Sequence, residues 1–150
     1  MEEGLGKNSF IDSLREGIDS ESLRMMGPLQ LAYIGDSVYE LFVRTMILSR
    51  EENVNKLHKK AVMYVKANAQ AASLQRLERV LTDEEKSIVR RGRNAKINTS
   101  PKNADLSEYK RATGFESLLG YLFLSKKDKR LIELLEIAHR TPVEEDLYEG

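Results

Sequence analysis

The chain has 150 residues, with 24 Lys and Arg against 24 Asp and Glu, and neither Cys nor Trp. Its 41% hydrophobic and 32% charged residues indicate one globular domain and exclude a disordered chain or a membrane protein. Without Cys, disulfides, thiolate metal sites and Cys nucleophiles are excluded. No export signal is visible and no apolar run approaches the roughly 18 residues that span a bilayer, so a cytoplasmic location is expected.

The neutral net charge hides an uneven distribution. Residues 1–40 carry a net charge of −5, residues 41–111 carry +8, and residues 112–150 carry −3. A solvated surface of mixed sign seldom contains a long run of one sign, so such a run indicates an anionic partner. Residues 86–104 form this kind of run, with no anion and six cations: Lys86, Arg90, Arg91, Arg93, Lys96 and Lys102.

The hydrophobic pattern has a helical period almost throughout, which predicts an all-α fold. In chain order, a short helix is expected over residues 10–16, and Gly27-Pro28 precedes a long helix that reaches about Ser49. The long helix is the most apolar. Because its apolar positions wrap most of its circumference, we expect it to be the central helix of the core.

The second half of the chain is also predicted to be helical. Thr82 and Glu85 form a capping box, and Asp105 and Asp128 are candidate N-caps. Residues 94–103 have the composition of a loop. The expected helices cover residues 54–80, as one bent helix or two short ones, then run from Thr82 to Gly92, from Asp105 to about Leu124, and from Asp128 through His139.

Two acidic residues interrupt apolar helical segments. Asp36 follows Gly35 inside LAYIGDSVYE, and Glu116 lies inside GFESLLGYLFL. An interior Gly costs about 1 kcal/mol relative to Ala, and an unpaired buried carboxylate costs several kcal/mol. Taken alone, Asp36 is more easily explained by pairing with an Arg or by capping a helix. Two such acids favour a shared cation, and oxygen ligands favour Mg²⁺ or Mn²⁺.

An acidic metal site beside a run of cations indicates chemistry on phosphate esters. A metal can activate water at the scissile phosphate while the cations hold neighbouring phosphates. Few aromatic residues lie among the cations, which argues against a protein that binds single-stranded nucleic acid. We therefore expect phosphate contacts from Arg91, Arg93, Lys96 and Lys102. The alternative is that these side chains complement a helix end or pair with acidic parts of the chain.

The two acidic segments resemble a known family. LAYIGDSVYE resembles the signature helix of ribonuclease III domains, and FESLLGYLFL resembles their second acidic helix, with the same order and separation. The similarity to the reduced bacterial branch, Mini-ribonuclease III, is closer still. It extends over about residues 29–124 and includes LHKK at 57–60, RGRNAK at 91–96 and SPKN at 100–103.

This resemblance implies a ribonuclease III-like helical bundle and a homodimer that cuts double-stranded RNA with Mg²⁺, which Mn²⁺ can replace. The substrates it implies are the ends of large-subunit (23S) ribosomal RNA precursors. Asp36 and Glu116 fall on the catalytic, metal-binding acids, and Tyr33 falls where the family inserts a side chain into the partner subunit. With duplex RNA as the implied partner, the expected RNA contacts are Arg91, Arg93, Lys96 and Lys102, with Lys59 and Lys60 as further candidates.

The expected organisation is a nuclease domain over residues 28–140, preceded by an N-terminal extension with a short helix (1–27) and followed by an acidic tail (141–150). Two acids of full-length ribonuclease III enzymes are replaced here by Ala32 and Thr113.

Glu40, one turn after Asp36, is a further candidate metal ligand, with a surface salt bridge as an equal alternative. Two rival functions stay open. A non-catalytic RNA-binding or ribosome-assembly module would bind RNA without cutting it. A metal-dependent nucleotide hydrolase would need no duplex.

Overall fold

The structure is a computed structural model that describes residues 9–96 and 105–139. These residues form helices and no strand, which confirms the predicted all-α fold. Most of the predicted loop, including Lys102, and the acidic tail lie outside the described residues. The helices are α2 (Phe10–Arg15), α3 (Ser20–Met25), α4 (Pro28–Ile47), α5 (Val54–Val65), α6 (Ala67–Leu77), α7 (Asp83–Arg93), α8 (Leu106–Leu124) and α9 (Asp128–Ala138).

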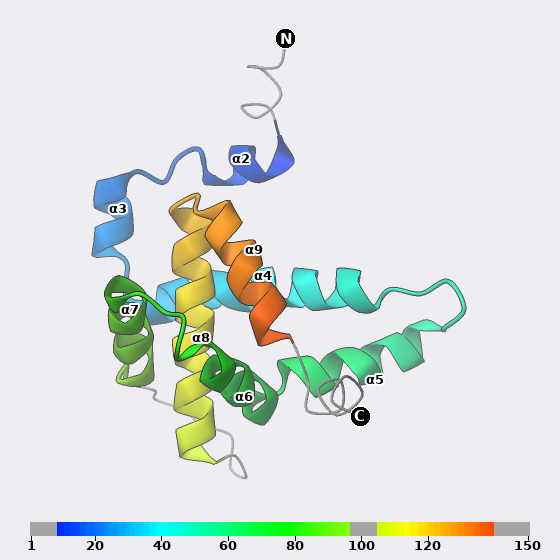
Figure 1. Ribbon diagram of the computed structural model, residues 1–150. Coiled ribbons are helices and arrows are strands. Elements are labelled where there is room, and N and C mark those ends of the chain that lie inside the picture. Colours follow the sequence, from blue (N-terminus) through cyan, green and yellow to red (C-terminus); the bar gives the residue numbers. More distant parts are fainter. Residues whose placement is uncertain (1–8, 97–104, 140–150) are drawn as a thin grey trace.

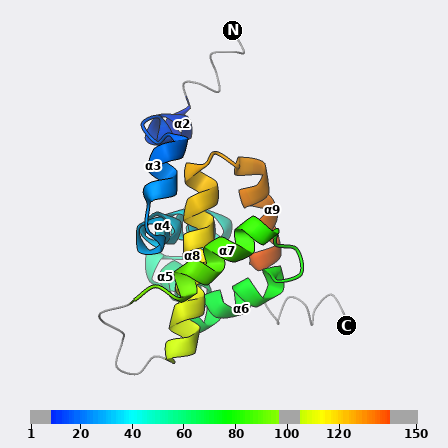
Figure 2. The same ribbon diagram turned by 90° about the vertical axis from the view of Figure 1, so that its left-hand side faces the viewer.

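The centre of the fold is α8. It runs across α4 and is surrounded by α4, α6, α7 and α9 (Figures 1 and 2). Both its apolar and its small residues are buried, because neighbouring helices enclose it from several sides. The residues of α8 that are 0% exposed are Phe115, Ser117, Leu118, Leu119 and Leu122.

The prediction that the long apolar helix is central is wrong. α4 buries one side, where Tyr39 and Val43 are 0% exposed, but on the other side Tyr33 and Leu41 are 79% and 61% exposed. An apolar pattern around a whole helix does not distinguish burial in the core from burial by another chain. Here the second side has no partner within the described part of the protein.

Glycine residues let α4 and α8 cross with their backbones in contact. A Cβ atom on Gly35 would lie 1.7 Å from the carbonyl oxygen of Glu116, and one on Gly120 would lie 1.9 Å from the carbonyl oxygen of Leu31. Real Cβ contacts essentially never fall below 3.0 Å, so neither position accommodates a side chain. This crossing places Asp36, the neighbour of Gly35, beside Glu116.

A second close approach joins α7 to α8. A Cβ on Gly92 would lie 2.6 Å from the Ser117 hydroxyl, and one on Gly114 would lie 2.8 Å from the carbonyl oxygen of Val89. The Ser117 hydroxyl is buried and donates a 2.8 Å hydrogen bond to the carbonyl oxygen of Pro28, at the start of α4. The three helices α4, α7 and α8 are therefore held at fixed separations.

Two of the three predicted helix caps are confirmed. The Glu85 amide donates to the Thr82 hydroxyl and the Thr82 amide donates to the Glu85 carboxylate, so the capping box forms. The Asp105 side chain accepts from the first turn of α8. The predicted Asp128 cap is wrong, because Asp128 is the first helical residue of α9 and its carboxylate accepts hydrogen bonds from the buried Arg15 guanidinium.

The segment over residues 54–80 resolves into two helices. The helix is interrupted at Lys66, whose extended backbone (φ −67°, ψ 156°) ends α5 and begins α6. The short helix α3 was not predicted, although Asp19 caps it by accepting a 2.7 Å hydrogen bond from the Ser22 amide. α3 buries none of its six residues, so the hydrophobic pattern has no helical period there.

We predict that Gly35→Ala destabilises the fold severely. The added methyl group would collide with the backbone of α8 rather than with a flexible side chain, so the free energy of unfolding should fall by about 3 kcal/mol or more. Urea denaturation measures this change. Gly17→Ala is the control, because nothing lies within 4 Å of its Cβ position. Equal stabilities for the two variants would contradict the backbone crossing.

Candidate active site

The structure brings the two predicted acids together. Asp36 lies on the exposed side of α4, directly after the crossing, and Glu116 lies on α8, with its backbone against Gly35. Their carboxyl groups are close enough to share a hydrogen bond. Helical packing thus joins residues that are eighty positions apart in the chain, because Gly35 removes the side chain that would separate the helices.

Burial and the neighbouring acid raise the pKa of Glu116 from 4.5 to about 8. Desolvation is the largest cause, followed by the hydrogen bond and charge of Asp36, while the Gln70 amide acts in the opposite direction. Near neutral pH, Glu116 therefore retains a proton in the absence of a cation. A divalent cation can take the place of that proton, because it neutralises both carboxylates at once.

The donor atoms suit a hard metal ion. Asp36 and Glu116 offer only oxygen, and Mg²⁺ is commonly bound through one or two carboxylates, with water and substrate phosphates filling its other positions. The residues present therefore fit such an ion. Among residues 9–96 and 105–139, no group of three or more His, Cys, Asp and Glu side chains gathers at one point.

The further candidate ligand Glu40 is engaged elsewhere. Its carboxylate accepts a 2.8 Å hydrogen bond from Arg44, one turn along α4, which corresponds to the salt-bridge alternative. A metal role for Glu40 therefore stays a prediction. The two residues that stand in place of family acids offer no carboxylate to a metal ion. Ala32 is buried, and the Thr113 hydroxyl donates to the carbonyl oxygen of Tyr109 in its own helix.

Sequence reasoning missed Gln70. This α6 residue is 3% exposed, and its Nε2 donates to Glu116 Oε2 at 3.4 Å and to the Val65 carbonyl oxygen at 2.9 Å. The only signal was a polar residue in a position of the buried stripe that also contains Leu74 and Leu77. That pattern can mark a polar contact but does not reveal the partner.

The predicted RNA-contact residues are exposed where the structure describes them. Lys59 and Lys60 lie on α5, and the Lys60 ammonium pairs with Glu52. Arg91 and Arg93 flank Gly92, which packs against α8, so their side chains leave α7 on different sides, and the stem of Arg93 lies close to Gly114 of α8. A hollow of about 360 Å³ between α6 and α7 is lined by Leu74, Glu78, Leu81, Lys86, Val89, Arg90 and Arg93.

Residues 29–127 match the ribonuclease III domain. The chain belongs to the ribonuclease III family. It is 45% identical to the Mini-ribonuclease 3 of Clostridium tetani over 139 residues, 91% of this chain and 92% of that relative. It is 50% identical to the Mini-ribonuclease 3 of a Thermoanaerobacter species over 124 residues, 82% and 87% of the two chains.

A solved structure supports the same placement. Protein FN1578 from Fusobacterium nucleatum is 32% identical and superposes with a TM-score of 0.71, covering 76% of this chain and 92% of that one. The Mini-ribonuclease branch, the ribonuclease III fold and an RNA-cleaving nuclease activity follow from these similarities. Within the described ranges, every helix is too short or too polar to cross a membrane.

We predict that the acid pair makes stability depend on pH. The folded state binds the Glu116 proton more tightly than the unfolded chain does, so this proton stabilises the fold below pH 4.5, and the stabilisation is lost as the pH rises through about 8. Each unit of pKa difference corresponds to about 1.4 kcal/mol. Glu116→Gln resembles the protonated acid and should exceed the wild type in stability at pH 9 by about 2 kcal/mol or more.

Urea denaturation in EDTA at pH 5, 7 and 9 measures this difference, which should shrink towards pH 5. Glu136→Gln, an exposed position on α9, is the control and should show no such trend. A difference between Glu116→Gln and the wild type that does not change with pH would contradict the raised pKa.

Proposed function

We propose that the protein is an endoribonuclease that hydrolyses double-stranded RNA with Mg²⁺ or Mn²⁺. Its proposed substrates are the ends of 23S ribosomal RNA precursors, in the cytoplasm. The observation that carries the proposal is the contact between Asp36 and Glu116 at the crossing of α4 and α8. The names of the relatives, which are ribonucleases, support the RNA substrate.

Asp36 and Glu116 would hold the divalent ion. When bound, such an ion supplies Lewis-acid activation of water and neutralises charge that develops on the phosphoryl group. Glu116 would release its proton when the site is loaded, and its carboxylate accepts a hydrogen bond from the Gln70 amide. Asp36 reaches the surface, where a phosphate of the substrate has access. Water adds to phosphorus while the bond from phosphorus to the 3′ oxygen breaks, and that oxygen takes a proton from water. The ends are then a 5′-phosphate and a 3′-hydroxyl, as the family resemblance implies.

The cations supply affinity for the duplex. α5 ends at Val65, whose carbonyl oxygen accepts from Gln70, the side chain that also contacts Glu116. Through Gln70, the end of α5 lies next to the acid pair. RNA bound at the acid pair can therefore extend along α5, where Lys59 and Lys60 are exposed. The other proposed RNA contacts are Arg91 and Arg93 in the last turn of α7, Lys96 just after it, and Lys102, which lies outside the described residues. Phosphate contacts of this kind are independent of sequence and weaken with salt.

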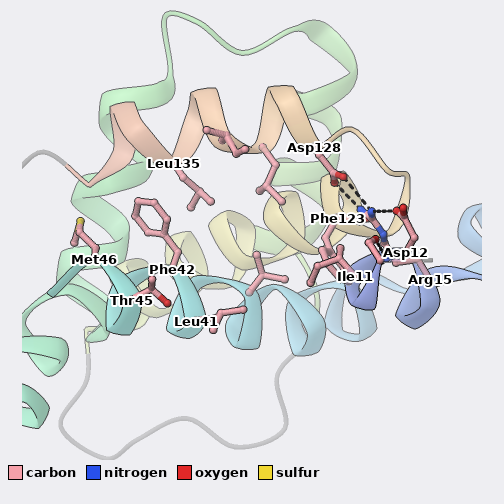
Figure 3. Close-up of a pocket in the computed structure, with 14 residues that line it drawn as sticks. Ile11, Asp12, Arg15, Leu41, Phe42, Thr45, Met46, Phe123, Asp128 and Leu135 are labelled. Carbon is pink, nitrogen blue, oxygen red and sulfur yellow. Dashed lines mark hydrogen bonds and ion pairs between the residues drawn. The ribbon is translucent and has the colours of Figure 1, made fainter. Parts of the chain in front are cut away.

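A second copy of the chain is the proposed partner of α4. Tyr33 and Leu41 lie two turns apart and are exposed, and Leu41 borders an apolar groove of about 590 Å³ between α2, α4 and α9 (Figure 3). Large apolar side chains beside an apolar hollow indicate a protein interface. In a two-fold pair of antiparallel α4 helices, Tyr33 of each copy approaches the Leu41 end of the other.

The activity is tested with long duplex RNA, single-stranded RNA and duplex DNA, each with Mg²⁺ or EDTA. We expect cutting of duplex RNA alone, and none in EDTA. Asp36→Asn should lower the rate by about 1,000-fold or more while duplex affinity is kept, because it removes a ligand and not a phosphate contact. Asp83→Asn, an exposed position in the first turn of α7, is the control.

The rival functions predict other results. Duplex binding without cutting in Mg²⁺ would support a non-catalytic RNA-binding module, which the replacement of two acids by Ala32 and Thr113 favours. Hydrolysis of small phosphate esters without need for a duplex would support a nucleotide hydrolase. Loss of affinity together with activity in Asp36→Asn would identify Asp36 as a structural residue.

The dimer is tested by sedimentation. Leu41→Glu places a charge on the exposed face of α4 and should convert the protein to a monomer, because an unpaired charge in an apolar interface costs several kcal/mol. Met63→Glu on α5 is the matched control, since Met63 is 60% exposed and Leu41 is 61% exposed. A wild-type monomer, or a Leu41→Glu dimer, would contradict the assignment of this face.

A further inference from the structure

Gln70 makes a contact that its packing does not explain. The side chain is 3% exposed, and its Oε1 is buried without a hydrogen-bond partner among the described residues. A buried carbonyl oxygen without a partner costs about 1–3 kcal/mol. Leu or Met would fill a similar volume without this cost. The amide is therefore retained for what its nitrogen does.

The orientation of the amide is determined by its neighbours. The Val65 carbonyl oxygen can only accept, so the group 2.9 Å from it must be the Nε2 donor, and the same nitrogen lies 3.4 Å from Glu116 Oε2. One hydrogen thus anchors the amide to the end of α5 and the other is directed to the acid. Contacts in catalytic sites are often long before substrate binds and then shorten.

Among the described residues, few other side chains near Glu116 can donate a hydrogen bond to its carboxylate. The buried Ala32 has no polar side-chain atom, and the Thr113 hydroxyl donates to Tyr109 within α8. In the described part of the chain, Gln70 is the one side chain that donates a hydrogen bond to Glu116. Glu116 is thus flanked by an acid from α4 and an amide from α6, on a backbone that the glycine crossing holds in place.

We propose that Gln70 is the positioning residue of the acidic pair: its Nε2 holds the Glu116 carboxylate towards Asp36 in the orientation that binds a divalent cation, and its second hydrogen anchors this arrangement to the end of α5. The inference rests on the proposed metal-dependent cleavage of RNA and adds a residue to that site. Groups that orient metal ligands in this way typically contribute 10–100-fold to metal affinity or activity.

The test compares Gln70→Leu and Gln70→Met with Gln75→Leu, which removes the same residue type from an exposed position on α6. Three quantities are measured: the melting temperature, the binding of Mn²⁺ by calorimetry without RNA, and kcat and KM for duplex RNA in Mg²⁺. Two apolar replacements are used so that a packing fault in one does not decide the result.

We expect both Gln70 variants to fold, because the unpaired carbonyl is removed together with the two hydrogen bonds. Their kcat should fall 10–100-fold, with KM close to that of the wild type and a weaker affinity for Mn²⁺. Excess Mg²⁺ should restore part of the rate. Gln75→Leu should match the wild type in all three measurements.

Wild-type kcat and Mn²⁺ affinity in either folded Gln70 variant would overturn the inference. So would a loss of rate that only follows the fraction of folded protein, with unchanged Mn²⁺ affinity, since this indicates a brace between α5 and α6. If the wild type cuts no duplex RNA, the proposed function fails separately. The Mn²⁺ titration then still decides whether Gln70 orients Glu116.

Discussion

The backbone contact between α4 and α8 is the constraint on which the site depends. Gly35 and Gly120 remove the two side chains that would keep the helices apart, and the carbonyl oxygens of Glu116 and Leu31 occupy that space. Asp36 follows Gly35 directly, so its position along the crossing is set by the same contact. The acid pair is therefore a consequence of helix packing, and loops are not needed to assemble it.

Two polar features of the site lower the stability of the free protein. The half-buried Glu116 beside Asp36 holds its proton to about pH 8, and the Gln70 carbonyl oxygen has no partner among the described residues. Each feature costs stability in the free protein. The surrounding core compensates, because α8 is enclosed by apolar residues of α4, α6, α7 and α9. A rigid scaffold of this kind can hold ligands in the geometry that a cation requires.

The first described helix, α2, meets the start of the last one, α9, beside the exposed groove. Arg15, which is 1% exposed, donates to Asp12, to the Phe123 carbonyl oxygen and to Asp128 at the start of α9. This buried guanidinium fixes α2 against the turn between α8 and α9 and thereby forms one wall of the groove beside α4 (Figure 3). The N-terminal segment thus contributes to the surface that we assign to the second subunit.

The sequence by itself determined the all-α class, the capping box at Thr82 and the two acids, because helical periodicity, caps and polar residues in apolar helices are local signals. The resemblance then identified the family, and the comparisons confirmed it. The sequence could not determine which helix is central: α4 is the most apolar, yet α8 is the most enclosed.

Only the tertiary structure showed that Asp128 binds Arg15 and that the Gln70 amide donates to Glu116. The reason is physical. Periodicity specifies which face of a helix is buried, but the partner of a polar side chain depends on how closely and at what angle two helices cross. At the acid pair, that separation is decided by glycines whose contacts lie far away in the chain.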